Sequence, residues 1–325
     1  MSESFVISTI PSVLLDQLGI SALGLVTEPQ ALSFDRFVHW VNLGYAGELK
    51  YLCDERKDKR KSLCEIFPNF KSAVVFLFSY PKTPLAENDL KIADYIFAFN
   101  DCDYHQILSQ RIKKFFSAIN ISEEHYQIAV DTAPILERDL AYRAGLGWIG
   151  KNSMLINRKL GSYFLIASAV FNIEITFSNQ KIIAQADLKE TDHCGNCRAC
   201  LDACPTNAII ENQRQIDSRL CISTYTIESF GGDKTPPSSK RGTQEIYGCD
   251  ICQSVCPWNN KVPMQELSQL KNSLVFENFY KNDIESIIKD LSSMSKRSFK
   301  KKFTHTALAR TGRDGMIKNL KDKIK

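Results

Sequence analysis

Eight of the eleven cysteines in this 325-residue chain lie close together, between positions 194 and 256. Their order is Cys194-x2-Cys197-x2-Cys200-x3-Cys204-Pro205, then a lone Cys221, then Cys249-x2-Cys252-x3-Cys256-Pro257. Thiolates at two- and three-residue spacing can wrap a cubane iron–sulfur cluster, and eight thiolates are enough for two [4Fe-4S] clusters. The pattern therefore predicts a protein that handles electrons one at a time.

The proline after each run of cysteines indicates how the ligands are shared. In the bacterial two-cluster pattern, the cysteine before proline ligates the other cluster. This rule assigns one cluster to Cys194, Cys197, Cys200 and Cys256, and the second to Cys204, Cys221, Cys249 and Cys252. Two tetrahedral zinc sites would also use eight thiolates, but the x2-x2-x3 run and the two Cys-Pro endings favour iron–sulfur. We expect the remaining thiols to be ordinary ones: Cys53, Cys64 and Cys102.

Composition bounds the size and location of the protein. With 44% hydrophobic and 24% charged residues, the chain can bury a full core and is expected to form about two domains. The N-terminus lacks a basic region, a twin-arginine pair and a small-residue cleavage site, and no apolar run approaches the roughly 18 residues of a membrane span. Labile clusters and unpaired thiols suit a reducing compartment. We therefore expect a cytoplasmic monomer with no membrane partner.

Positive charge is concentrated at the end of the chain. The segment from Lys296 to Lys325 holds eleven Lys and Arg residues and only two acidic ones, Asp314 and Asp322, although the net charge of the whole chain is only +4. A basic segment interleaved with Phe299 and Phe303 can face a phosphate backbone. A solvated basic helix explains the charge equally well.

The order of predicted elements indicates an α+β protein. We expect helices at 31–52, 104–119 and 134–144, and strands at 72–80, 127–130 and 162–171, with no regular strand–helix–strand repeat. The prediction is a mixed α/β domain at 1–186, a ferredoxin-like domain at 187–261 and a small helical C-terminal region at 262–325. A loop rich in Gly, Pro and Ser at 230–242 separates the two cysteine motifs.

A glycine-rich segment imitates a nucleotide-binding loop. Gly145-Leu-Gly147-Trp-Ile-Gly150 matches GxGxxG, and its continuation to Asn152 comes within one residue of a Walker A motif. Both motifs require a strand before the loop and a helix after it. Here a charged helix precedes and a short strand-like segment follows, so we expect no nucleotide site; glycines that let a bulky ligand approach the backbone are a better explanation.

The sequence Asp103-Tyr104-His105 begins like the Asp-x-His-x-x-Gly motif that some cobalamin proteins use to place a histidine on cobalt. Leu108 stands where that motif has glycine. We therefore do not expect His105 to bind cobalt, and another role for it in an active site stays open.

Four segments together resemble epoxyqueuosine reductases: VDTAPILERDLAYRAGLGWIGKNSMLI (130–156), HCGNCRACLDACPTNAI (193–209), CISTYTIE (221–228) and YGCDICQSVCPWN (247–259). The resemblance spans nearly the whole chain. It implies a cobalamin-dependent iron–sulfur enzyme of the bacterial cytoplasm, which reduces epoxyqueuosine to queuosine at the wobble position of tRNA.

The resemblance also implies roles for individual residues. Asp131 matches the proposed proton donor of the family. Because a free Asp has a pKa near 3.9, it would need an apolar or anionic setting to act as an acid, and its sequence neighbours supply the apolar option. A helix-capping role for Asp131 is about as probable from sequence alone. Family positions near the corrin are matched by Lys151, Asn152, Ser153, Ser223, Thr226 and Asp250. The implied partners are tRNA carrying epoxyqueuosine and an external low-potential electron donor.

Two other functions remain possible at this point. A reductive dehalogenase would also combine cobalamin with two clusters, but those proteins resemble exported chains with a twin-arginine signal. A ferredoxin-type electron carrier would leave the 186 residues before the cysteine domain unexplained.

Overall fold

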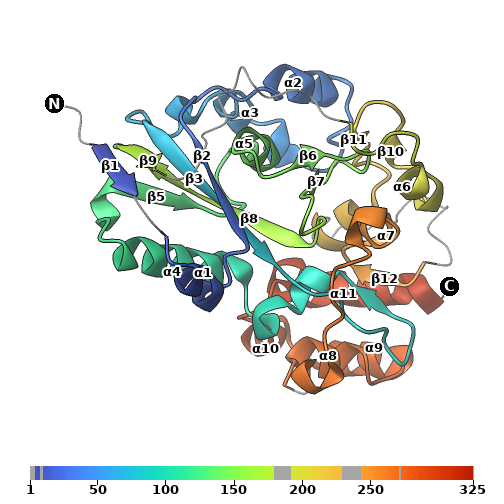
Figure 1. Cartoon of the computed structure of the whole chain (residues 1–325). Helices are drawn as coiled ribbons and strands as arrows, with labels where there is room; N and C mark the ends of the chain where they lie inside the picture. Colours follow the sequence, from blue (N-terminus) through green and yellow to red (C-terminus); the bar gives the residue numbers. More distant parts are fainter. Residues whose placement is uncertain (1–3, 8–9, 179–191, 229–242, 271, 325) are drawn as a thin grey trace. The chain divides into compact units, whose positions relative to one another are not determined.

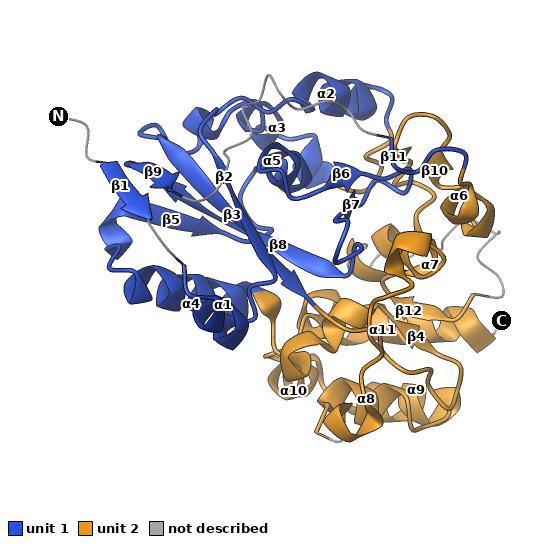
Figure 2. Cartoon of the chain, in the orientation of Figure 1, with its two compact units in different colours: residues 1–44, 50–79, 105–196 blue, residues 45–49, 80–104, 197–325 orange. Residues whose placement is uncertain are grey.

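The computed structural model describes residues 4–7, 10–178, 192–228, 243–270 and 272–324. The chain forms two compact units, which Figure 2 shows in blue and orange. The first unit comprises residues 1–44, 50–79 and 105–196, and the second comprises 45–49, 80–104 and 197–325. Each unit therefore combines segments that are far apart in the sequence.

The first unit is built on a four-stranded antiparallel sheet with the strand order β2–β3–β8–β5 (Figure 1). Its strands are β2 (Ala22–Val26), β3 (Ser72–Ser79), β8 (Phe164–Phe171) and β5 (Tyr126–Ala129). Two smaller strand pairs are β1 (Ser4–Ile7) with β9 (Glu174–Phe177), and β6 (Trp148–Ile149) with β7 (Leu155–Ile156). The described helices are α1 (Ser12–Leu18), α2 (Phe34–Asn42), α3 (Arg56–Lys59), α4 (Tyr104–Ala118) and α5 (Glu137–Arg143), with 3-10 turns η1 (Lys50–Leu52), η2 (Leu63–Glu65) and η5 (Glu123–His125).

Helices cover both faces of this sheet, as Figure 1 shows for α4 and α5. On one face, Leu140 of α5 belongs to the same buried cluster as Val75 of β3. On the other face, Phe115 and Phe116 of α4 meet Phe76 edge to face, with ring centroids 5.5 and 5.8 Å apart. Successive side chains of a strand point to opposite faces. The uninterrupted apolar run of β3 is therefore buried on both sides, and residues 73–78 have no exposed surface.

Several predicted elements of this unit are confirmed. β3 covers the predicted strand at 72–80, and α4 covers the predicted helix at 104–119. The predicted helix at 31–52 is wrong in its length, because α2 ends at Asn42. Gly44 and Gly47 then take left-handed backbone angles, with φ of 73° and 54°, which a continuing helix cannot contain.

Helix α5 begins three residues later than the sequence predicts. The loop before it contains two tight turns, in which the N–H of Thr132 bonds to the carbonyl of Val130, and the N–H of Ile135 bonds to that of Ala133, both over 2.7 Å. A residue before proline disfavours the helical region, which keeps Ala133 out of the helix. The chain between β5 and α5 is therefore an irregular loop, and it starts with Asp131.

The second unit consists of short elements and a group of C-terminal helices. Its strands are β4 (Lys91–Ile92) paired with β12 (Glu245–Tyr247), and β10 (Ile209–Ile210) paired with β11 (Gln215–Ile216). Its described helices are α6 (Ala199–Ala203), α7 (Ile251–Ser254), α8 (Leu274–Phe279), α9 (Ile284–Ser293), α10 (Lys296–Lys302) and α11 (Leu308–Ile324). Short turns are η3 (Asp94–Ile96), η4 (Ala98–Asp101), η9 (Pro257–Asn259), η10 (Leu267–Leu270) and the π-helix η7 (Thr224–Glu228).

Aromatic residues of the C-terminal helices form the core of this unit. Phe279, Phe299 and Phe303 are at most 1% exposed and pack with Ile92 and Ile246 of the β4–β12 pair. Phe299 and Phe303 of the basic segment therefore belong to the core of this unit. Only the basic side chains between them are on the surface, because a helix turns its apolar stripe inward.

The observed α+β architecture agrees with the prediction. The boundary predicted at residue 187 and the predicted loop at 230–242 lie outside the described residues. By packing, residues 197–261 share one unit with residues 262–325. The three functional domains at 1–186, 187–261 and 262–325 stay a prediction. Within the part of the chain that the structure describes, no helix combines the length and the apolar character needed to cross a membrane.

A buried hydrogen-bond network fastens α11 to the π-helix that follows Cys221. The Asn319 side-chain amide is 3% exposed and donates to the carbonyls of Thr226 and Ile246, each over 2.9 Å. The Thr311 hydroxyl donates to the carbonyl of Ile227 over 3.1 Å. A π-helix departs from the regular bonding of an α-helix. Side chains of α11 therefore donate hydrogen bonds to backbone carbonyl groups of η7.

Replacing Asn319→Ala should lower the apparent melting temperature of the cluster-loaded protein. The change leaves two buried carbonyls without this donor, which costs about 1–3 kcal/mol, or a shift of about 2–8 °C in a domain of this size. Lys321→Ala, an exposed change on the same helix, should leave the melting temperature within about 1 °C. Equal melting curves for both variants would show that the network does not stabilise the unit.

Candidate active site and cluster-ligand cysteines

Asp131 stands at the point where the chain leaves β5. Its backbone has a φ of 56°, in the left-handed region that few non-glycine residues adopt. Its side chain is 50% exposed, and one carboxylate oxygen lies 3.6 Å from Nε2 of His105, at the start of α4. Its backbone N–H donates to Oε1 of Glu137 over 2.8 Å. Asp131 is therefore placed between a histidine and a second carboxyl group.

The structure corrects two expectations for Asp131. The N-cap position of α5 is held by Leu136, so Asp131 is not the helix cap. The apolar enclosure expected for its carboxyl group is also wrong, because half of the side chain is exposed. Its neighbour is instead a second carboxyl group, that of Glu137.

Glu137 is the strongest electrostatic feature of this loop. Its pKa is raised to about 8: enclosure by protein is the largest cause, the nearby charge of Asp131 adds to it, and the hydrogen bond from the Asp131 amide opposes the shift. A carboxyl group with such a pKa holds its proton at neutral pH. Sequence reasoning missed Glu137, although it is the first of three charged residues, Glu137-Arg138-Asp139, at the start of α5. The sequence left the role of His105 in an active site undecided, because only the packing of α4 on the sheet brings that residue to Asp131.

The glycine-rich segment forms the β6–β7 hairpin, so no helix follows it and the nucleotide-loop interpretation is excluded. A Cβ atom on Gly147 would lie 2.2 Å from the carbonyl oxygen of Ile156, and one on Gly150 would lie 2.5 Å from the Ile156 side chain. The packing of the hairpin itself therefore requires these glycines, and no ligand is needed to explain them.

Three residues predicted to lie near a cofactor occupy the tip of this hairpin. Lys151 donates to the carbonyl of Gly195 over 2.6 Å, and Ser153, with a φ of 63°, accepts hydrogen bonds from Arg138. Both are half-buried, and their ammonium and hydroxyl groups suit the amide side chains of a corrin ring. Asn152 is only 1% exposed and accepts the backbone N–H of Met154. It can influence a bound cofactor only through the shape of the hairpin.

The cysteines predicted for the second cluster lie within electrostatic reach of one another. The thiol of Cys252 interacts with Cys249, Cys221 and Cys204, and that of Cys221 with Cys204. Burial is the main cause that raises the pKa values of Cys221, Cys249 and Cys252. Buried thiols become thiolates when a cation is present to compensate their charge. A donor set of four neighbouring thiols, three of them with pKa values raised by burial, therefore fits a cationic iron–sulfur core.

Hydrogen-bond donors surround these sulfur atoms. Ser223 donates its backbone N–H and its hydroxyl group to Cys221, and the N–H of Ala208 donates to Cys204 over 3.3 Å. Such bonds to cluster sulfur atoms tune the reduction potential. Ser223 therefore contacts a predicted cluster ligand directly.

Thr226 and Asp250, the other residues predicted to lie near a cofactor, have partners inside the protein. The Thr226 hydroxyl, 3% exposed, donates to the carbonyl of Ile222 over 2.9 Å and accepts the N–H of Gly248 over 3.0 Å. Asp250 accepts the backbone N–H of Asp94 over 2.7 Å and an amide hydrogen of Gln253 over 3.0 Å. Burial raises the pKa of Asp250. These side chains therefore support the chain around the cysteines.

The four cysteines predicted to hold the other cluster are spread more widely along the chain: Cys194, Cys197, Cys200 and Cys256. Cys200 is in α6, and Cys256 lies two residues after α7 at the start of η9; α6 and α7 pack against each other. Cys204 and Cys256, which both precede proline, adopt extended backbone angles, as residues before proline prefer. Cys194 belongs to the first unit, whereas Cys197, Cys200 and Cys256 belong to the second. This ligand set stays a prediction. Among the described residues, no three His, Cys, Asp or Glu side chains converge closely enough to hold a single metal ion.

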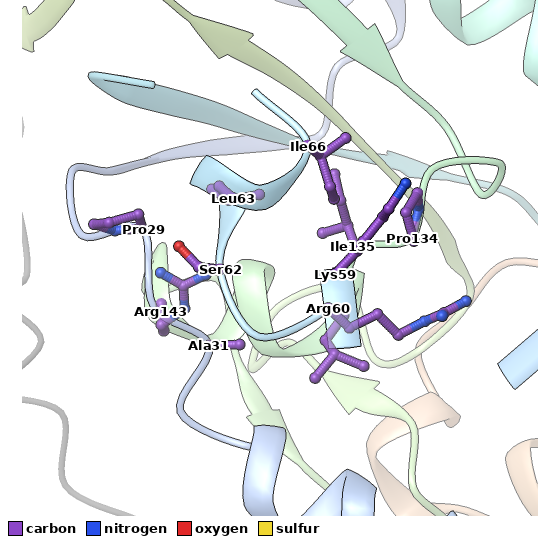
Figure 3. Close-up of a pocket in the computed structure, with 11 residues that line it drawn as sticks. Pro29, Ala31, Lys59, Arg60, Ser62, Leu63, Ile66, Pro134, Ile135 and Arg143 are labelled. Atoms are coloured by element: carbon purple, nitrogen blue, oxygen red, sulfur yellow. The ribbon is translucent and has the colours of Figure 1, made fainter. Parts of the chain in front are cut away.

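A small cavity of about 10 Å³ lies behind the loop that carries Asp131. Figure 3 shows Pro134 and Ile135 of this loop facing Lys59, Arg60 and Ile66 across it. Such a volume holds about one water molecule. The loop is therefore not tightly packed on the side away from its hydrogen bond to Glu137.

Comparisons with known proteins agree with this geometry. Residues 193–259 match the family of 4Fe-4S double cluster binding domains, and residues 60–132 match the family "Epoxyqueuosine reductase QueG, DUF1730". The chain thus contains a domain for two [4Fe-4S] clusters, which decides the question between iron–sulfur and zinc.

Curated relatives match over almost the entire chain. The chain is 36% identical to the epoxyqueuosine reductase of Leadbetterella byssophila, over 94% of this chain and 92% of that protein. It is 36% identical to that of Cyclobacterium marinum, over 87% of this chain and 85% of the relative.

Solved structures match as well. A crystal structure of epoxyqueuosine reductase with an epoxyqueuosine-modified tRNA-Tyr stem loop is 26% identical, with a TM-score of 0.72 over 95% of this chain and 79% of that one. The Bacillus subtilis enzyme, in a structure whose catalytic aspartate loop is swung out of the active site, is 25% identical with a TM-score of 0.68 over the same shares. The cysteine pattern, the fold and these relatives lead to one conclusion: the chain belongs to the epoxyqueuosine reductase family, and it is an oxidoreductase.

Proposed function

We propose that this protein reduces epoxyqueuosine in tRNA to queuosine, the last step of queuosine formation, with cobalamin and two [4Fe-4S] clusters. The observation that carries the proposal is the pair formed by Asp131 and His105, 3.6 Å apart, in a chain that also brings four thiols within electrostatic reach of one another. One feature can supply a proton and the other can hold an electron carrier. Membership of the family and the tRNA stem loop bound by a solved relative support the choice of substrate.

The reaction sets the requirements that the residues must meet. Removing the epoxide oxygen as water and leaving an alkene consumes two electrons and two protons. Iron–sulfur clusters deliver electrons singly, and no side chain is a strong enough reductant to break the carbon–oxygen bond. When bound, cobalamin would supply that chemistry through reduced cobalt, a strong nucleophile. The protein must then orient the substrate, exclude water and protonate the departing oxygen.

Asp131 is the proposed proton donor. Its half-exposed carboxyl group is accessible to a bound nucleotide, and it lies beside Glu137, whose raised pKa lets the two carboxyl groups retain a proton between them near neutral pH. His105, within 3.6 Å, can orient the Asp131 carboxyl group. We propose Asp131 as the counterpart of the catalytic aspartate named for the Bacillus subtilis enzyme.

The remaining cofactor contacts follow from what the side chains can reach. In the first unit, Lys151 and Ser153 would hold cobalamin from the hairpin tip. In the second unit, Ser223 matches a family position near the corrin and also contacts Cys221. For this reason the cluster on Cys204, Cys221, Cys249 and Cys252 is the proposed direct donor of electrons to cobalt. The other cluster would take electrons from an external low-potential donor. A cytoplasmic location and a monomeric state are part of the same proposal.

Helix α10 is the proposed contact for the tRNA backbone. Its residues Lys296, Arg297, Lys300, Lys301 and Lys302 are all exposed, and it has no acidic residue. Lys302 donates to the amide oxygen of Asn278, and Lys296 pairs with Asp314. Because the last turn carries three lysines, the helix dipole also stabilises their charge. A positive surface of this kind attracts phosphates without reading sequence.

Replacing Asp131→Asn should abolish turnover while leaving both clusters and the cobalamin affinity intact. Loss of a general acid lowers a rate by about 100- to 10,000-fold. Conversion of epoxyqueuosine-containing tRNA is measured by mass spectrometry of the digested RNA, and cluster content by absorbance. The exposed change Asp35→Asn is the control and should retain full activity. Wild-type turnover in the Asp131 variant would remove this residue from the mechanism.

Changing Lys300, Lys301 and Lys302 together to Gln should weaken tRNA binding at low salt. If each lysine contacts one phosphate, the slope of log affinity against log salt should fall by about 2–3. A matched triple change of exposed lysines in the first unit, Lys71, Lys113 and Lys114, removes the same charge and should affect the slope much less. Equal slopes for the two triple variants would mean that α10 is a solvated helix without a tRNA contact.

The proposal as a whole is tested with protein that contains both clusters. Adding cobalamin and a low-potential reductant should convert epoxyqueuosine-containing tRNA to queuosine, and omission of either should stop the reaction. A complete cofactor set that yields no queuosine would contradict the proposed function.

A further inference from the structure

The loop from Val130 to Leu136 is fastened at its first turn by one side chain of the following helix. Asp131 adopts a left-handed backbone angle, φ 56°, which costs free energy unless other contacts hold it. One contact that holds it is the hydrogen bond from the Asp131 N–H to Oε1 of Glu137, 2.8 Å long. The bond closes the loop on itself, because it joins the first residues of the loop to the first residue of α5.

We propose that Glu137 is the positioning residue for Asp131: its carboxyl group acts as a latch that holds the loop with Asp131 turned toward His105. This inference rests on the proposed role of Asp131 as proton donor. It adds a residue that touches neither substrate nor cofactor and that acts through the backbone of the acid.

Helix α5 is a firm base for such a latch. Asp139 accepts the backbone N–H of Ser33 over 2.7 Å and pairs with Arg143 over 2.8 Å. Arg143 also donates to the carbonyl of Glu28 over 2.6 Å, and both members of the ion pair are 3% exposed at their side chains. Buried, fully bonded polar groups fix the position of an element. Glu137, at the start of α5, is therefore held in place independently of the loop.

The loop itself has fewer restraints. Pro134 and Ile135 of the loop line the small cavity (Figure 3), which leaves space for about one water molecule beside the loop. Its internal hydrogen bonds are the two tight turns at Thr132 and Ile135, which do not tie it to the sheet. Without the bond to Glu137, the strained angle at Asp131 could relax and the carboxyl group would leave His105. The bond to Glu137 therefore decides where the acid points.

Charge gives the latch a second effect. The charged groups that face Glu137 are Asp131 on the loop, His105 on α4 and Arg138 on α5 itself. The raised pKa of Glu137, about 8, means that the two carboxyl groups retain a proton between them at neutral pH. Above that pH the pair carries two negative charges. The pair should then lose its ability to donate a proton.

Two substitutions separate positioning from charge. Glu137→Gln retains an oxygen that can accept the Asp131 N–H, whereas Glu137→Ala removes the acceptor. In cluster-loaded protein, Glu137→Ala should speed amide hydrogen exchange in the 130–136 segment by about 5- to 10-fold, the effect of one lost hydrogen bond. It should slow single-turnover conversion by about 10- to 100-fold, with the KM for tRNA unchanged. Glu137→Gln should restore protection at pH 7. It should restore most of the rate only at lower pH, where the single remaining carboxyl group still holds its proton.

The matched control is Glu285→Ala, which removes an exposed acid from the first turn of α9. It should change neither exchange at 130–136 nor the rate. If Glu137→Ala exchanges and turns over like the wild type, or if Glu137→Gln is as defective as Glu137→Ala in both measurements, the latch is contradicted. Hydrogen exchange tests the latch even if the wild-type protein does not act on epoxyqueuosine. The latch and the proposed function can therefore fail separately.

The pH dependence provides a further measurement. The single-turnover rate of the wild type should fall as the pH rises through about 8. In Glu137→Gln this fall should occur at lower pH, because one carboxyl group then holds the proton without an anionic neighbour.

The stability of the protein should depend on pH for the same reason. The folded protein keeps the Glu137 proton up to about pH 8, whereas an unfolded chain releases it near 4.5, so ionisation of Glu137 costs stability as the pH rises. The melting temperature of Glu137→Gln relative to the wild type should therefore increase between pH 6 and pH 9. An unchanged pH profile and a constant difference in melting temperature would contradict the coupling.

Discussion

The gathering of four cysteine thiols in one region is the constraint on which the second unit depends. Thiolates in a protein interior repel one another and lose hydration, so they require a cation among them. Burial already raises the pKa values of Cys221, Cys249 and Cys252. A [4Fe-4S] cluster removes this cost by replacing protons with iron. The surrounding chain must then keep the sulfur atoms at the spacing that the cluster needs.

Much of the second unit can be understood as a support for that spacing. The π-helix after Cys221 is bonded to Asn319 and Thr311 of α11, and the Thr226 hydroxyl accepts the N–H of Gly248, beside Cys249. The C-terminal helices thus combine two properties. Their apolar stripe completes a core, and the exposed face of α10 offers positive charge to a polyanion.

The cysteine pattern and the long elements could be predicted from the sequence, because both depend on local spacing. The burial of β3 follows from its apolar run, and α4 follows from its amphipathic period. The surroundings of Asp131 could not be predicted, because they depend on packing between segments distant in sequence: His105 comes from α4 and Glu137 from α5. The inward position of two aromatic residues in the basic C-terminal segment could not be predicted for the same reason. Only the tertiary structure shows that Phe299 and Phe303 face inward.

The central claim is that the clusters feed electrons to one reaction in which Asp131 supplies a proton. It is tested most directly by mixing cobalamin-loaded protein, with both clusters reduced and free reductant removed, with epoxyqueuosine-containing tRNA. Electron paramagnetic resonance then follows the reduced clusters while mass spectrometry follows queuosine. The account predicts that cluster oxidation and queuosine formation proceed together, with two electrons lost per epoxide reduced. Queuosine formed without cluster oxidation, or clusters oxidised without product, would contradict it.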